Sequence, residues 1–211
     1  MVIVKAPLQQ VIELENKIFL LKIFSPEIAR TVKPGQFLNV LVTKAYYPLL
    51  RRPFSVCDVE EDYFYLMFNI FGEGTRLLSR MHPGDLIDVL GPLGNGFNLD
   101  EDYETAVIVA GGLGTGSLGF KGTVIELLKD KINLIKSSKV KIFGCGPTAM
   151  LKALKEFSIE NNFNCEVSTE SAMACGFGIC QGCPMEGVNS PDKYLLVCKD
   201  GPVFNVKDIV L

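Results

Sequence analysis

Four cysteines near the C-terminal end constrain this chain more than any other feature. Three of them fall within "ESAMACGFGICQGCPME", residues 170–186, and the fourth lies in "YLLVCKDGPVF". The resulting spacing is C-x4-C-x2-C-x14-C, formed by Cys175, Cys180, Cys183 and Cys198. This is the plant-type arrangement of [2Fe–2S] ligands. The spacing therefore predicts an iron–sulfur cluster held by four thiolates.

Two other uses of these cysteines are less consistent with the spacing. A zinc site made of four cysteines usually consists of two knuckles with C-x2–4-C spacing, and Cys198 has no partner knuckle. Disulfides are disfavoured in a reducing cytosol, and a chain of 211 residues can bury a core without them. The glycines between the ligands let the backbone curl closely around a compact cluster. Zinc stays open as the alternative.

Composition and charge exclude several classes of function. The net charge is −3 and no Lys/Arg-rich run occurs, so nucleic acid is not expected as a partner. No stretch approaches 18 uninterrupted apolar residues, so no membrane span is expected. The first residues lack the pattern of a signal peptide, which favours a soluble, cytoplasmic protein. The only histidine, His82, lies in the turn-like "MHPGD", so it is expected on a surface loop and not in acid–base catalysis.

The chain divides into three regions by pattern. Residues 1–98 contain short apolar or alternating runs separated by Gly/Pro turns, which predict a small antiparallel barrel of five or six strands with a helical turn at "EGTRLLSRM". Residues 99–168 alternate strand and helix, which predicts a doubly wound parallel sheet. There, "TAVIVAGG" is typical of a strand buried on both faces. Residues 169–211 hold the cysteines in a small metal-organised lobe.

Four further motifs are candidates for ligand contacts, and the first three have ordinary structural readings as well. "AGGLGTG", residues 110–116, follows a strand and suits a pyrophosphate, although many strand-to-helix turns carry glycines for steric reasons alone. "RRPFS", residues 51–55, and "GEGT", residues 72–75, could contact phosphate or could be a basic strand start and a plain loop. Cys145 in "GCGP" lies at the end of a parallel strand, where α/β sheets bind ligands.

Taken in their order along the chain, these motifs resemble those of the ferredoxin–NADP reductase superfamily. More narrowly, the chain resembles the iron–sulfur electron-transfer subunits of type B dihydroorotate dehydrogenase. The resemblance runs along nearly the whole chain, through "RPFS", "GEGT", "GPLGNGF", "GSLGFKGTV", "CGPTAM" and the cysteine spacing with "CKDGPVF". It implies an FAD-binding barrel at 1–98, an NAD-binding α/β domain at 99–168 and a [2Fe–2S] domain at 169–211.

The resemblance also implies roles for individual residues. FAD would contact residues of "RPFS", of the stretch "FNI" at 68–70 and of "GEGT". These residues are Arg52, Pro53, Phe54, Ser55, Phe68, Asn69, Ile70, Gly74 and Thr75. Family members often carry Arg where this chain has Asn69. NAD(H) would contact Gly111, Gly112, Gly114, Cys145, Gly146 and Pro147.

One departure from the family concerns the nucleotide domain. Only Thr115 separates Gly114 from Gly116, whereas a strand–helix–strand unit takes roughly 30 residues or more. A segment near residues 112–118 is therefore either deleted from this protein or left out of the sequence. Such a deletion would leave the NAD site incomplete.

The expected function is electron transfer between NAD(H), FAD and a [2Fe–2S] cluster in pyrimidine biosynthesis. The implied partner is the FMN-containing catalytic subunit of dihydroorotate dehydrogenase, in a heterotetramer. No catalytic side chain is expected, because the cofactors carry the redox chemistry. Two alternatives stay open: a subunit of a ferredoxin- or sulfur-linked NAD(P)H oxidoreductase, using NADH or NADPH, and a zinc-stabilised interaction module.

Overall fold

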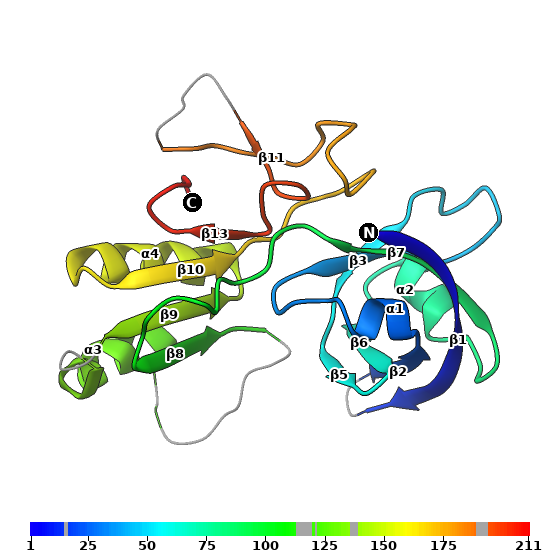
Figure 1. Ribbon diagram of the computed structural model, residues 1–211, viewed down its shortest axis with the longest axis horizontal. Helices are drawn as coiled ribbons and strands as arrows, with labels where there is room; N and C mark the ends of the chain where they lie inside the picture. Colours follow the sequence, from blue (N-terminus) through cyan, green and yellow to red (C-terminus); the bar gives the residue numbers. More distant parts are fainter. Residues whose placement is uncertain (15–16, 113–119, 121, 136–138, 189–193) are drawn as a thin grey trace. The chain divides into compact units, whose positions relative to one another are not determined.

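The computed structural model forms two compact units. The first comprises Met1–Gly96 and Ala172–Cys183, and the second comprises Phe97–Ser171 and Pro184–Leu211. Figure 1 shows both units. The structure describes residues 1–14, 17–112, 120, 122–135, 139–188 and 194–211. The division into domains 1–98, 99–168 and 169–211 stays a prediction.

The first unit is a curled antiparallel sheet (Figure 1). Over the residues described there, seven strands follow the order β4-β3-β7-β1-β2-β6-β5. Two short helices, α1 (Pro26–Ala29) and α2 (Glu73–Leu78), accompany the sheet. The strands are β1 (Val2–Glu13), β2 (Ile18–Phe24), β3 (Phe37–Leu41), β4 (Arg52–Ser55), β5 (Asp58–Glu60), β6 (Tyr63–Asn69) and β7 (Leu86–Leu93). The expected antiparallel barrel and the helical turn are confirmed, with one more strand than predicted.

Alternation of buried and half-exposed side chains builds the core of this unit. In β2 and β6 every second residue is buried, because successive strand side chains point to opposite faces of the sheet. The two strands pair antiparallel, from Ile18 opposite Asn69 to Phe24 opposite Tyr63. The buried set on these two strands consists of Phe19, Leu21, Ile23, Phe64, Leu66 and Phe68.

The long strand β1 joins two parts of the sheet. Residues Val2–Pro7 pair with β7, and Leu8–Glu13 pair with β2. The sequence did not predict this strand, because its polar and apolar residues alternate poorly and Pro7 lies inside it. Proline within a run is more typical of edge strands or loops.

The second unit is built on a parallel sheet. Its described strands follow the order β13-β10-β9-β8, and β8, β9 and β10 run parallel while β13 runs antiparallel to β10. Strand and helix alternate through β8 (Thr105–Ala110), α3 (Val124–Ile135), β9 (Val140–Cys145), α4 (Thr148–Glu160) and β10 (Asn164–Ser168). Three short strands follow: β11 (Pro184–Met185), β12 (Leu195–Leu196) and β13 (Val203–Asn205). The predicted parallel alternation is confirmed.

The expectation that the strand of "TAVIVAGG" is buried on both faces is wrong. β8 is the last strand in the order of the described sheet, and Ile108 is 78% exposed. Of its six residues, Val109 alone is buried. A strand at the end of a sheet has a neighbour on one side only, so fewer elements are at hand to cover it.

A buried ion-pair network ties the start of the second unit to its sheet. Lys141 in β9 is 1% exposed. Its Nζ donates to the carbonyl of Asn98 at 2.7 Å and lies 3.0 Å from carboxylate oxygens of both Glu101 and Glu166. Glu166 in turn accepts the backbone N–H of Asn98 at 2.9 Å. Because buried charges are costly unless paired, these contacts depend on one another.

Two expectations about surfaces can be compared with the structure. His82 is exposed, as expected. Among the described residues, no helix is both long and apolar enough to span a membrane.

Candidate functional site

The first unit contains a loop that carries three of the predicted cluster ligands. Cys175 is half-buried, Cys180 is exposed and Cys183 is buried. Gly176 and Gly178 have φ angles of +80° and +88°, which side chains other than glycine rarely adopt. These two glycines let the backbone fold back, and the N–H of Cys180 donates to Cys175 Sγ at 3.4 Å.

Backbone dipoles in this loop favour a thiolate at Cys175. Burial opposes ionisation of this thiol, but the N–H groups of Cys180, Phe177 and Ile179 outweigh it and lower the pKa of Cys175 to about 6. Hydrogen bonds from amides to the charged form are a known cause of such a shift. The same N–H groups would stabilise the negative charge of a cluster ligand.

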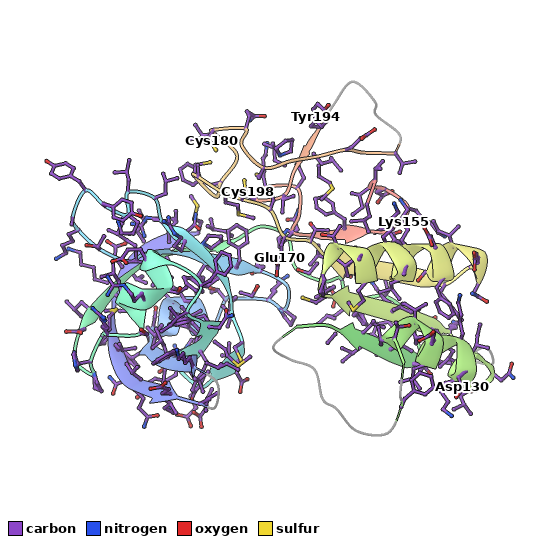
Figure 2. The ribbon with its side chains drawn as sticks, turned by 180° about the vertical axis from the view of Figure 1, so that it is seen from behind. Asp130, Lys155, Glu170, Cys180, Tyr194 and Cys198 are labelled. Carbon is purple, nitrogen blue, oxygen red and sulfur yellow. The ribbon has the colours of Figure 1, made fainter. Side chains whose placement is uncertain are left out.

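The fourth predicted ligand, Cys198, belongs to the second unit and follows β12; Figure 2 labels it together with Cys180. It is buried in a tight turn, in which the N–H of Leu196 donates to Asp200 Oδ2 and the N–H of Asp200 donates to the carbonyl of Leu196, both at 2.7 Å. All seven cysteines are free of disulfides. Within the described ranges, no three His, Cys, Asp or Glu side chains are gathered closely enough to hold a metal ion. The donor chemistry suits iron–sulfur or zinc, and the four-cysteine ligand set stays a prediction.

A hollow of about 240 Å³ in the first unit brings the two predicted FAD motifs together. Part of its lining comes from β4 and part from the start of α2, although these segments are about twenty residues apart in the sequence. The lining residues are Tyr47, Arg52, Pro53, Phe54, Phe71, Gly72, Glu73, Gly74 and Thr75. Five of the nine residues expected to contact FAD therefore share one cavity.

Arg52 and Gly74 meet closely in this hollow. A Cβ placed on Gly74 would lie 3.2 Å from both Cγ and Nε of Arg52, so a side chain there would push the arginine aside. The guanidinium donates to the carbonyl of Leu50 at 2.7 Å. The Thr75 hydroxyl accepts the N–H groups of Phe71 and Gly72 at 2.9 and 3.2 Å. A cation beside a glycine cradle suits a phosphate-bearing cofactor.

The other residues expected near FAD do not line this hollow. Phe68 is buried in the sheet core and its ring lies 5.6 Å from that of Phe54. Ser55, Asn69 and Ile70 are exposed. Their roles toward FAD stay predictions.

In the second unit, the predicted nucleotide motifs meet at one edge of the parallel sheet. The last residues of β8 and β9, Ala110 and Cys145, are paired, and the N–H of Gly111 donates to the carbonyl of Cys145 at 2.8 Å. A Cβ on Gly146 would lie 3.0 Å from the Cα of Gly111. Glycine at both positions therefore permits the two turns to touch. Gly112 has a φ of +98°, and Gly114 lies outside the described residues.

Next to this edge lies a second hollow, of about 320 Å³. Its lining comes from the start of α4, the end of β10, strand β11 and the C-terminal residues. The lining residues are Gly146, Pro147, Thr148, Leu151, Thr169, Glu170, Met185, Val210 and Leu211. Burial raises the pKa of the neighbouring Cys145 thiol, and the carboxylate of Glu170 raises it further. A raised pKa makes this thiol a poorer nucleophile, because the thiolate is the reactive form.

Comparison with known proteins decides the family. The family model described as the iron-sulfur cluster binding domain of dihydroorotate dehydrogenase B matches residues 170–210, which include all four cysteines. The "Dihydroorotate dehydrogenase B (NAD(+)), electron transfer subunit" of Caldanaerobacter subterraneus subsp. tengcongensis is 33% identical, over 84% of this chain and 87% of the relative. The chain belongs to this family of electron transfer subunits.

Two relatives are longer than this chain within the aligned region. The electron transfer subunit of Bacillus velezensis is 32% identical over an aligned length of 250 residues. The alignment covers 95% of the relative and 94% of this chain, which has 211 residues. On the order of 50 residues of that relative therefore have no counterpart here. This length difference agrees with the expected missing segment. Residues 113–118, where the sequence places the gap, lie outside the described residues.

Solved structures confirm the ferredoxin-reductase-like fold. An NADH-dependent reduced ferredoxin-NADP oxidoreductase aligns with a TM-score of 0.82 and 22% identity, over 98% of this chain and 90% of the other. Phthalate dioxygenase reductase aligns with a TM-score of 0.57 and 15% identity, over 93% and 94%. Along the chain, the cysteine segment follows the antiparallel sheet and the parallel strands β8, β9 and β10, as the sequence predicted.

Sequence reasoning missed several residues at these sites. Tyr47 and Phe71 line the first hollow, and Phe71 is 94% exposed. Phe71 directly precedes "GEGT", and this position next to a predicted cofactor motif was a usable signal. The position of Tyr47 depends on the fold of the loop before β4, which no local pattern reveals.

Proposed function

We propose that this chain is the electron-transfer subunit of a dihydroorotate dehydrogenase of type B, passing electrons between NAD(H), FAD and a [2Fe–2S] cluster. The observation that carries the proposal is the 33% identity over most of both chains, with all four cysteines inside the matched iron–sulfur segment. The likeness at 22% identity to a ferredoxin-linked enzyme concerns the fold alone. It therefore gives the ferredoxin-linked alternative no separate support.

When bound, FAD exchanges a two-electron hydride and a plant-type cluster carries single electrons. The residues supply binding and electrostatics. Arg52 would neutralise cofactor phosphate beside the cradle of Gly74. The loop amides at Cys175 would stabilise its thiolate. Cys175, Cys180, Cys183 and Cys198 would ligate the cluster.

Dihydroorotate chemistry would take place on a partner. The proposed partner is the FMN-containing catalytic subunit, assembled with this chain in a cytoplasmic heterotetramer without membrane or nucleic acid. The relatives' name, an electron transfer subunit, supports a separate catalytic subunit.

The cofactor content tests this proposal against a zinc-stabilised module. We expect the purified full chain to be coloured, with iron and acid-labile sulfide in equal amounts, each twice the amount of flavin. Visible absorbance, flavin extraction and metal analysis measure this. A colourless protein with stoichiometric zinc and no flavin would refute the proposal.

Substitution of Arg52 tests the FAD hollow. Arg52→Ala should weaken FAD binding roughly 10–100-fold, because hydrogen bonds to charged groups contribute about 1.5–3 kcal/mol. Flavin release into dilute buffer measures this. Arg30→Ala is the matched control, since Arg30 is exposed and pairs with Asp62, away from the hollow. Equal retention of flavin in the two variants would show that Arg52 does not contribute to FAD binding.

The missing segment leads to a prediction about NADH. We expect NADH to bind roughly tenfold or more weakly than to the Bacillus velezensis subunit, because each lost hydrogen bond to a charged group is worth about 1.5–3 kcal/mol. Anaerobic titration of the flavin absorbance compares the two proteins, and reduction by dithionite is the control for intact flavin. Equal affinities would mean that the absent residues carry no nucleotide contacts.

A further inference from the structure

Asn39 is a buried polar residue of the first unit that the proposed function does not use. Asn39 lies in β3, where the residues from Phe37 to Val40 are all buried, and it is 1% exposed. Its three buried neighbours in the strand are apolar. An amide among them is unfavourable unless its polar atoms are hydrogen-bonded, so a specific contact is expected.

That contact is with the cysteine loop. The Nδ2 group of Asn39 donates to the carbonyl of Cys175 at 2.9 Å, across 136 residues of sequence. Its Oδ1 is buried and has no hydrogen-bond partner among the described residues. The bond to Cys175 is therefore the one hydrogen bond that this side chain forms within the part of the chain that the structure describes.

The loop is shaped to receive this amide. A Cβ on Gly176 would lie 2.0 Å from Nδ2 of Asn39 and 2.9 Å from its Cγ. Gly176 also has a φ of +80°. Both space and backbone conformation therefore require glycine at this position, directly after the first predicted cluster ligand.

The backbone of Asn39 adjoins the proposed FAD site. β3 pairs with β4, and Asn39 lies opposite Pro53, with Leu38 opposite Phe54 and Val40 opposite Arg52. Pro53, Phe54 and Arg52 all line the first hollow. Arg51 Nη1, just before this motif, donates to the carbonyl of Asn39 at 3.3 Å. One residue thus connects the strand of the hollow with the loop of Cys175.

We infer that Asn39 is a positioning residue that fixes the Cys175 loop against strand β3 and so sets the placement of the cluster relative to the flavin. This inference rests on the proposed function, in which β4 contacts FAD and Cys175 ligates the cluster. Removing the donor leaves the Cys175 carbonyl without its partner and frees the loop from the sheet. Mutation of the groups that hydrogen-bond to metal ligands typically costs roughly 10–100-fold in metal affinity or activity.

The test compares three variants of the full chain with bound cofactors. Asn39→Leu and Asn39→Asp keep the size of the side chain and remove the donor. Leu21→Ala is the control, because Leu21 is fully buried in β2, opposite Val11 of β1 and Leu66 of β6, so its truncation weakens the same sheet at strands other than β3. Hydrogen exchange of residues 172–183, the electron paramagnetic resonance of the reduced cluster and the rate of flavin-to-cluster electron transfer are measured.

We expect both Asn39 variants to exchange the loop amides roughly tenfold faster, to alter the resonance signature, and to slow electron transfer roughly 10–100-fold. Leu21→Ala should lower the unfolding midpoint with the loop and the transfer rate unchanged. Wild-type exchange and rate in Asn39→Leu, or the same losses in Leu21→Ala, would overturn the inference.

A further variant tests the inference if the Asn39 variants fail to fold. Gly176→Ala should push the loop from Asn39 and reproduce the faster exchange, and unchanged exchange would count against the inference. A wild-type chain that contains no iron would contradict the proposed function instead. Hydrogen exchange of residues 172–183 in the Asn39 variants would then be the measurement that tests whether Asn39 holds the loop.

Discussion

Replacing Cys198 with serine should remove the iron–sulfur cluster and leave the flavin in place. Cys198 is buried in the second unit, in a turn closed by Asp200. Serine has nearly the same volume, so the fold should persist, but a hydroxyl is a far poorer ligand for iron than a thiolate. Even outer-shell substitutions cost 10–100-fold in metal affinity, so loss of a ligand should cost on the order of 100-fold or more.

Iron, sulfide and flavin analysis of the purified variant measures this effect. Cys57→Ser is the matched control, because Cys57 is an exposed thiol outside the iron–sulfur segment. We expect the control to keep the iron and flavin content of the wild type. A Cys198→Ser protein with full iron content would show that the fourth ligand is another group.

Replacing Lys141 with methionine should destabilise the second unit by roughly 3–5 kcal/mol, the typical effect of breaking a buried ion pair. Lys141 Nζ lies between the carboxylates of Glu101 and Glu166 and the carbonyl of Asn98. Methionine fills similar space, but it leaves the buried Glu166 carboxylate without its cation. Urea unfolding followed by circular dichroism measures the change, since the chain has no Trp.

Two further variants separate the buried charge from a general effect of losing a lysine. Lys139→Met should barely change the unfolding midpoint, because Lys139 forms an exposed ion pair with Asp102. The double variant Lys141→Met with Glu166→Leu should recover much of the lost stability, because no buried carboxylate then lacks its cation. Glu101 loses the lysine as well, but its side chain is 38% exposed and accepts a hydrogen bond from Asn98 Nδ2. A Lys141→Met protein as stable as the wild type would show that the network contributes little.

Much of the fold was predictable from local patterns. Alternation in β2 and β6 and the glycine-ended runs of β8 and β9 indicated the antiparallel and parallel sheets. β1 was missed because its pairing partners, β2 and β7, are known only from the fold and its own pattern is weak. The exposure of β8 depends on its place at the end of the described sheet, which a strand's own residues do not encode.

The candidate sites show the same division. Arg52 and Gly74 were predicted from short motifs, and the structure brings both into one hollow. Tyr47 and Asn39 were not predicted, because their contacts arise from tertiary packing between segments remote in sequence. A buried asparagine in an apolar strand is visible in "QFLNVLV", but nothing in that stretch identifies the loop that it binds.

Transfer of electrons from dihydroorotate tests the central claim most directly. The full chain is mixed anaerobically with the catalytic dihydroorotate dehydrogenase subunit of the same organism, and dihydroorotate is added while visible absorbance is recorded. We predict that the flavin and cluster absorbance of this chain bleaches only when both proteins are present. Bleaching by dihydroorotate without the catalytic subunit, or none in the mixture of cofactor-loaded proteins, would contradict the account.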